Sequence, residues 1–132
     1  MAEAVLRAGL GAGYEVGSAG VAALVGEPAD PLAVDVMREH GHDISEHRGR
    51  QVVLPMLLNA ELILALDRTH SAVLVRQYPH LRGRVHKLLR WRGDADVEDP
   101  FRQSKAAFEH AYRDIDLGVQ DWVARLQKNR PV

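Results

Sequence analysis

The sequence predicts an α/β protein built on an open parallel sheet with flanking helices. Helical and strand patterns alternate along the chain in the order α-β-α-β-α-β-α, as in a parallel sheet whose strands are joined by helical crossovers. A continuous apolar run at 61–66 (ELILAL) has the length of a strand that is buried on both faces. A long amphipathic pattern at 103–128 predicts the last helix.

In the first half of the chain, the local signals predict a helix, a strand and a second helix. Residues 2–10 are rich in helix formers and are followed by glycine, whereas residues 14–18 show the alternation of a short strand. Asp30 before Pro31 is typical of a helix N-cap and first turn, and Gly41 is typical of a helix end. We therefore expect a helix between Asp30 and Gly41.

The second half contains the remaining elements. Residues 55–59 predict a helical turn, and residues 69–78 predict a helix that ends before a proline. Residues 85–91 alternate between basic and apolar side chains, which predicts another strand. In the last helix, Gly118 suggests a bend.

The glycines near the N-terminus are spaced as they would be in a phosphate-binding loop. A dinucleotide loop, however, needs a strand before its glycines and a helix after them. Here the glycines follow the predicted helix, where glycine is typical of helix ends and turns. We interpret the following as turn residues: Gly9, Gly11, Gly13 and Gly17.

The composition describes a single globular domain that spans residues 1–132. A hydrophobic content of 46% is typical of a folded chain, and a net charge of −1 argues against a broad nucleic-acid surface. Polar residues and a proline interrupt the longest apolar stretch, 52–66, so we expect no membrane insertion. Glu3 and Arg7 lie where a signal peptide would be apolar, so we expect no signal peptide.

The sequence contains no cysteine. This excludes disulfides, thiolate metal sites and a cysteine nucleophile within these 132 residues. The composition agrees with a reducing compartment, and we expect a cytoplasmic location. None of the seven histidines forms an i, i+4 pair around a glutamate, so we expect no metal and no cofactor.

Seven short segments stand in a characteristic order along nearly the whole chain. They are MAEAVLR (1–7), SAG (18–20), GEPADP (26–31), GHDISEHRGRQV (41–52), ELILALDRTH (61–70), RVHKLL (84–89) and DVEDPFRQSKAAFEHAY (96–112). In this order and spacing they resemble the low-molecular-weight protein tyrosine phosphatases. The resemblance is greatest to the bacterial members that accompany capsule and exopolysaccharide synthesis, an assignment that depends mainly on DPFRQSKAAFEHAY.

The resemblance implies the fold and the reaction of that family. The fold is a flavodoxin-like, three-layer arrangement (phosphotyrosine phosphatase I-like), and the reaction hydrolyses phosphotyrosine in proteins through a cysteinyl-phosphate intermediate. In the family the nucleophile lies in a Cys-x5-Arg-Ser-Pro loop between the first strand and the first helix, and the family pattern places this loop immediately before Met1. We therefore expect that the first strand is missing and that the chain as given is inactive.

The resemblance assigns the role of general acid to Asp99. This residue stands in Asp99-Pro100-Phe101, where the proline stiffens the loop. In the family the acid protonates the leaving phenolate and later activates water. From the residues alone, an aspartate before a proline is more typical of an N-cap for the helix that follows. Asp96 in the same loop is a weaker alternative for the acid.

Other residues match family positions around the substrate. Phe101 stands where the family usually has a tyrosine beside the phosphotyrosine ring, and an aromatic ring there could stack on the substrate. The alternative is that Phe101 anchors the last helix in the core. Ser18 matches a serine that supports the phosphate loop. Four more residues match positions that are structural or near the site: His47, Arg48, Asp67 and His70.

Two interpretations of the function stay open. In the first, the chain is the body of an active phosphatase whose signature lies upstream. In the second, it is a natural non-catalytic relative that binds or regulates a phosphoprotein. The expected partner is a phosphotyrosine protein, with a tyrosine kinase of a polysaccharide system as the candidate. Arsenate reduction on the same fold requires redox cysteines, which the sequence does not contain.

The missing strand also predicts self-association. In the family's sheet the first strand lies between the strands that correspond to 14–18 and 61–66. Its loss leaves two strand edges without backbone partners, which is a costly arrangement. We expect a homodimer in which a second chain repairs the sheet or exchanges a segment.

Overall fold

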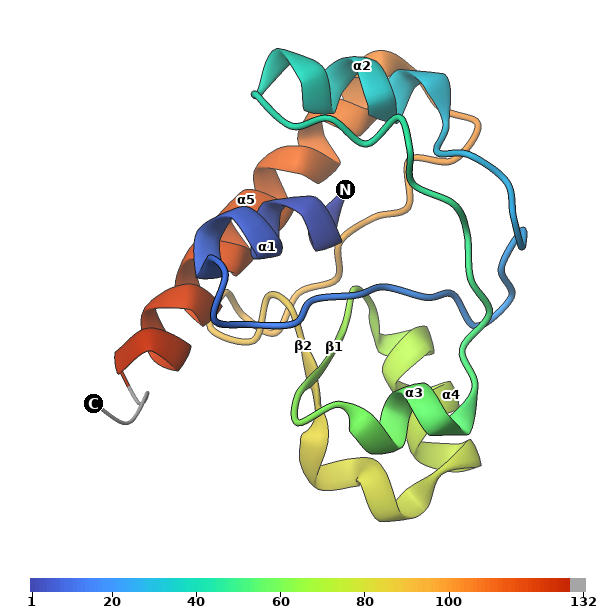
Figure 1. Cartoon of the computed structure of the whole chain (residues 1–132), viewed down its shortest axis with the longest axis vertical. Helices are drawn as coiled ribbons and strands as arrows, with labels where there is room; N and C mark the ends of the chain where they lie inside the picture. The colour runs from blue at the N-terminus through green and yellow to red at the C-terminus, as the bar shows by residue number, and fades with distance from the viewer. Residues whose placement is uncertain (129–132) are drawn as a thin grey trace.

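The computed structural model describes residues 1–128, which form five α-helices, one 3₁₀-helix and two strands (Figure 1). The elements are α1 (Ala2–Leu10), α2 (Pro31–Glu39), α3 (Leu54–Asn59), β1 (Ile63–Ala65), α4 (Arg68–Gln77), the 3₁₀-helix η1 (Pro79–Arg84), β2 (Val85–Lys87) and α5 (Lys105–Lys128). All the predicted helices are confirmed. Asp30 is the N-cap of α2, because its Oδ1 accepts a hydrogen bond from the backbone N–H of Leu32 at 2.8 Å.

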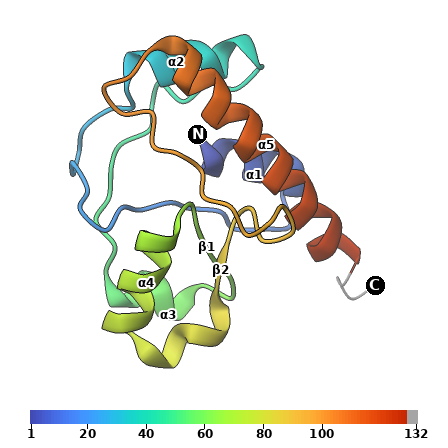
Figure 2. The same ribbon diagram turned by 180° about the vertical axis from the view of Figure 1, so that it is seen from behind.

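The elements form three layers with the sheet in the middle. Helices α1, α2 and α5 lie together on one side, and α3 and α4 lie on the other side, in both views of the molecule (Figure 1, Figure 2). Helix α5 contacts both α1 and α2, whereas α4 contacts both strands. This arrangement confirms the predicted α/β class with a parallel sheet and flanking helices.

The sheet separates two hydrophobic cores. Strands β1 and β2 are parallel, with Ile63 opposite Val85. Because alternate side chains of a strand point to opposite faces, Leu64 packs against the core formed with α1, α2 and α5, while Ile63 packs against the core of α3, α4 and η1. The apolar run at 61–66 therefore makes contacts on both faces, as its composition predicted.

The strand predicted at 14–18 is wrong. This segment runs as an extended chain across the molecule (Figure 1), but it pairs with no neighbouring strand among the described residues. A strand requires a backbone partner for its N–H and C=O groups. Here side chains take that place, because Arg7 Nη2 donates to the Val16 carbonyl at 2.6 Å and Arg50 Nε donates to the Ser18 carbonyl at 3.1 Å.

The strand predicted at 85–91 is shorter than expected. Strand β2 ends at Lys87, and the chain then turns toward α5. The carbonyl of Leu88 accepts a hydrogen bond from Trp122 Nε1 at 3.0 Å instead of continuing a strand ladder. Helix α5 itself continues without interruption through Gly118.

Candidate active site

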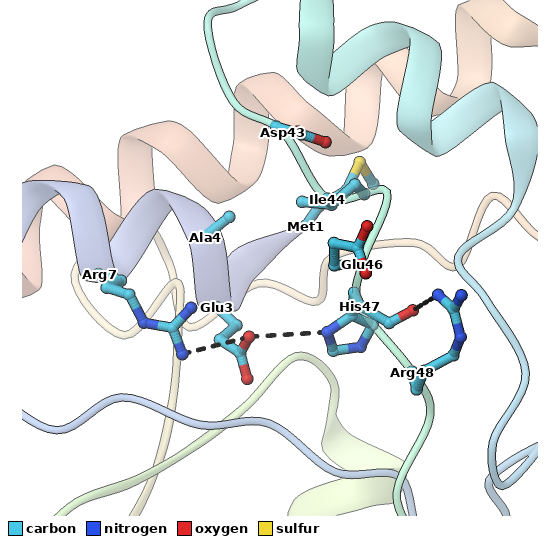
Figure 3. Close-up of a pocket in the computed structure, with 9 residues that line it drawn as sticks. All are labelled: Met1, Glu3, Ala4, Arg7, Asp43, Ile44, Glu46, His47 and Arg48. Atoms are coloured by element: carbon cyan, nitrogen blue, oxygen red, sulfur yellow. Dashed lines mark hydrogen bonds and ion pairs between the residues drawn. The ribbon is translucent and has the colours of Figure 1, made fainter.

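Two adjacent cavities flank the N-terminal end of α1, and Met1 lines both of them. The first, of about 350 Å³, lies between α1 and the segment 43–48 (Figure 3). The second, of about 300 Å³, is bounded by Leu66 and Asp67 after β1 and by the segment 97–101. In open parallel sheets, ligands bind beyond the carboxyl ends of the strands. The second cavity occupies this position.

Asp99 lines the second cavity and is exposed to solvent. Its Oδ1 accepts a hydrogen bond from the N–H of Phe101 at 3.0 Å, and its carbonyl accepts one from Gln103 Nε2 at 3.2 Å. These contacts form an Asx turn, and Oδ2 has no hydrogen-bond partner among residues 1–128. Helix α5 begins only at Lys105, so the alternative in which Asp99 caps this helix is wrong.

Phe101 lines the same cavity and is exposed to solvent. It is 52% exposed, and the guanidinium carbon of Arg102 lies 5.2 Å from the ring centroid. The phenylalanine that packs α5 into the core is Phe108, which is 3% exposed. The alternative of a core role for Phe101 is therefore wrong, and its ring is free to contact a ligand.

Asp67 and His70 also line the second cavity. Asp67 is the N-cap of α4, since its Oδ1 accepts from the backbone N–H of His70 at 2.8 Å and lies 3.6 Å from His70 Nδ1. The structure thus brings these two residues to the same cavity as Asp99 and Phe101. All four were predicted from the sequence.

Asp96 belongs to a different set of contacts. Its Oδ1 lies 2.6 Å from Lys87 Nζ and accepts from the backbone N–H of Arg68 at 3.0 Å. The hydrogen bond from Lys87 is the main reason that the pKa of Asp96 is lowered. Sequence reasoning missed Lys87; its position in the apolar segment VHKLL was the available signal.

The first cavity has a charged network centred on Glu3 (Figure 3). Glu3 Oε1 accepts from Ser18 Oγ at 3.0 Å, and Oε2 lies 3.4 Å from Arg7 Nη2 and 3.6 Å from His47 Nδ1. Arg48 donates to backbone carbonyls of its own turn at 2.8 and 3.1 Å. Ser18 therefore contacts α1, and Glu3, which sequence reasoning missed, connects three segments. The signal for it was an acidic residue in the first helical turn.

The described part of the chain contains no group of three histidine, cysteine or acidic side chains that could hold a metal ion. Nor do residues 1–128 include a helix that combines the length and the hydrophobicity of a membrane span.

The ordered motifs and this fold agree with a comparison against protein-family models. The model of the low molecular weight phosphotyrosine protein phosphatases matches residues 1–132. The chain belongs to this family. The family resemblance that the sequence segments predicted is thereby confirmed.

Individual phosphatases of the family are similar over nearly the whole chain. A probable low molecular weight protein-tyrosine-phosphatase, EpsP from Ralstonia nicotianae, is 42% identical over 127 residues, which cover 96% of this chain and 86% of the relative. Etp from Escherichia coli K12 is 38% identical over 116 residues, covering 88% of this chain and 78% of the relative. The structure of Vibrio vulnificus Wzb in complex with benzylphosphonate superposes with a TM-score of 0.88 at 36% identity, covering 94% of this chain and 87% of that one.

Proposed function

We propose that this phosphatase-family chain supplies the general acid and a substrate-flanking ring for the hydrolysis of phosphotyrosine in proteins. The observation that supports this role is the shared position of Asp99 and Phe101, which line one cavity beyond the carboxyl end of β1, beside the N-terminal end of α1. Asp99 Oδ2 is available for a proton, and the exposed Phe101 ring is available to stack on an aryl group.

The proposed reaction has two steps. A thiolate attacks phosphorus, and the bond from phosphorus to the tyrosine oxygen breaks while protonated Asp99 gives its proton to the leaving phenolate. The Asp99 carboxylate then accepts a proton from water, which attacks the cysteinyl phosphate and releases phosphate and the thiolate. Since the 132 residues contain no cysteine, we expect them to turn over no phosphotyrosine without a nucleophile from another segment.

The test separates the contribution of Asp99 from that of the nucleophile. The chain alone and the chain joined at Met1 to a strand and a Cys-x5-Arg-Ser-Pro loop are assayed on phosphotyrosine peptide and on p-nitrophenyl phosphate. We expect turnover only from the joined protein. There Asp99→Asn lowers kcat on phosphotyrosine by about 10²- to 10⁴-fold, and by less on p-nitrophenyl phosphate, whose leaving group needs little protonation. Equal effects on the two substrates would contradict an acid role.

A non-catalytic binding function is the second candidate, and the cysteine-free composition agrees with it as it does with the first. The cavity with Asp99 and Phe101 is formed in these 132 residues, so it can be tested for ligands directly. Titration with a phosphotyrosine peptide, followed by NMR shifts at Phe101, would support this candidate if binding occurs without turnover. Equal shifts with the unphosphorylated peptide would count against recognition of the phosphate.

We include three finer statements in the proposal. The substrate is a phosphotyrosine protein of a capsule or exopolysaccharide system, with its tyrosine kinase as partner, and the segment DPFRQSKAAFEHAY supports this. A cytoplasmic location agrees with the cysteine-free composition. The whole of 1–132 acts as one domain, which the contacts of α5 with α1 and α2 support.

We also propose that the chain self-associates through its sheet. Strand β1 pairs with β2 alone among the described residues, and the segment 14–18 has arginine side chains on two of its carbonyl groups. The second edge of β1 is therefore available to a strand from a second copy, whereas pairing at 14–18 requires the two arginine contacts to be released first. Light scattering across a concentration series should show a dimer. A monomer at all concentrations, together with a cooperative thermal transition, would contradict this proposal.

A further inference from the structure

Lys87 is the single charged residue that is buried within residues 1–128. It is the last residue of β2, and its side chain is 10% exposed. An ammonium group that is removed from water needs charged or hydrogen-bonding partners, because burial without them is strongly unfavourable. The identity of these partners therefore shows what the lysine holds in place.

All the partners of the Lys87 ammonium group among the described residues belong to one segment, residues 94–101, which we call the acid loop. Nζ lies 2.6 Å from Asp96 Oδ1 and 4.0 Å from Asp94 Oδ2, and it donates to the carbonyl of Asp94. The acid loop begins with Asp94 in a left-handed conformation (φ 52°), which is uncommon for a residue other than glycine. Lys87 thus binds the beginning of the acid loop to the end of the sheet.

Two backbone hydrogen bonds complete this attachment. Asp96 Oδ1 also accepts from the N–H of Arg68 in the first turn of α4, and the N–H of Val97 donates to the carbonyl of Leu66 after β1 at 2.8 Å. Val97 is buried in the core beside α5. Residues 94–97 therefore form polar contacts with three elements: β2, α4 and the end of β1.

Among residues 1–128, no hydrogen bond or ion pair joins residues 98–101 to the sheet or to α4. The hydrogen bonds of Asp99 join it to Phe101 and to Gln103, which lie two and four residues further along the same chain. These bonds define the shape of the turn, but they do not set its position relative to the sheet. The position of Asp99 over the cavity therefore depends on the attachment at 94–97 before it and on the start of α5 at Lys105 after it.

We propose that Lys87 is a positioning residue that holds Asp99 at the cavity through its pair with Asp96. The proposal rests on the acid role proposed for Asp99. The lowered pKa of Asp96 agrees with it, because the lysine stabilises the charged carboxylate. The expected consequence of removing the lysine is a local loss of order in the acid loop, while the three layers stay folded.

The experiment uses the ¹⁵N-labelled chain as it is, without turnover. In Lys87→Met, we expect the order parameters of Asp99 and Phe101 to fall from about 0.85 to below about 0.6. Amide exchange at Val97 should become about tenfold faster, the effect of losing one hydrogen bond to a charged group. Exchange in α5 should not change, which separates positioning from general destabilisation.

A matched control removes a different lysine–carboxylate pair. Lys105 Nζ lies 2.5 Å from Glu39 Oε1 and connects the start of α5 to α2, without contacting residues 94–97. Lys105→Met makes the same change in charge, and the amide exchange rate of Val97 should be the same in this variant as in the parent. If Lys87→Met does not fold, Asp96→Asn is the second variant, because it removes the negative charge of the same pair at its more exposed residue.

The proposal is overturned if the acid loop keeps the order parameters of the parent in both Lys87→Met and Asp96→Asn. In the double variant the two changes should be non-additive, because each removes the same interaction; additive effects would also contradict a Lys87–Asp96 mechanism. The acid role can fail separately, since the leaving-group test of Asp99 measures turnover. If the acid loop loses order in Lys87→Met but Asp99→Asn does not change turnover, Lys87 holds the loop in place and has no role in catalysis.

Discussion

Gly118→Ala should destabilise the protein, although alanine is the better helix former. The Cβ of alanine at this position of α5 would lie 2.8 Å from Leu88 Cγ, 2.9 Å from the Leu88 carbonyl oxygen and 2.9 Å from Leu89 Cδ2. Favourable carbon contacts lie at about 3.5–4.0 Å. One of these atoms is backbone, and the same carbonyl accepts from Trp122. Leu88 therefore cannot move away from the added Cβ without weakening its hydrogen bond with Trp122.

The magnitude follows from two opposing contributions. Replacing an interior helical glycine by alanine favours the helix by about 1 kcal/mol. Overpacking a well-filled core costs about 1–3 kcal/mol, and three contacts, one of them with backbone, place Gly118 at the upper end of that range. The net free energy of unfolding should therefore fall by roughly 2 kcal/mol.

Urea denaturation followed by circular dichroism measures this difference. Gly83→Ala is the control, because no atom lies within 4 Å of the Cβ that it would add, and we expect its free energy of unfolding to stay within about 0.5 kcal/mol of the parent. A Gly118→Ala variant as stable as the parent would refute the reasoning. It would mean that α5 and the segment after β2 can move apart without a cost in folding free energy.

Three further predictions use the same measurement. Asp30→Ala should lower the free energy of unfolding by about 1 kcal/mol, because the N–H of Leu32 loses its cap; no change would show that this N–H is already solvated. Phe108→Ala, at 3% exposure, should cost about 3–5 kcal/mol; a loss below about 1 kcal/mol would contradict its place in the core. Since the folded pKa of Asp96 is lowered from an unfolded value near 3.9, its stabilisation is present above about pH 4 and is lost as the pH falls through the folded pKa. The stability advantage of the parent over Asp96→Asn should therefore shrink as the pH falls below about 4, and an advantage that does not change with pH would exclude a role for ionised Asp96.

Local sequence signals were sufficient for the helices and for the class of fold. The cap and proline at Asp30 and Pro31 act within one turn, and the apolar stripe of α5 needs only the helical period. The apolar run at 61–66 indicated contacts on both faces, because a strand without polar alternation has no face for water. The order of short motifs indicated the family, and through it predicted an acid role for Asp99, which stays a prediction.

Tertiary structure decided what depends on a distant partner. The segment 14–18 is no strand because strand structure belongs to a pair of backbones, and arginine side chains occupy its carbonyl groups instead. Asp99 is no helix cap because α5 begins at Lys105, six residues further along the chain. The pairing of Lys87 with Asp96 joins a strand end to a loop nine residues later, and no local pattern specifies such a contact. Elements formed by neighbours in sequence could thus be predicted, whereas contacts formed across space required the folded molecule.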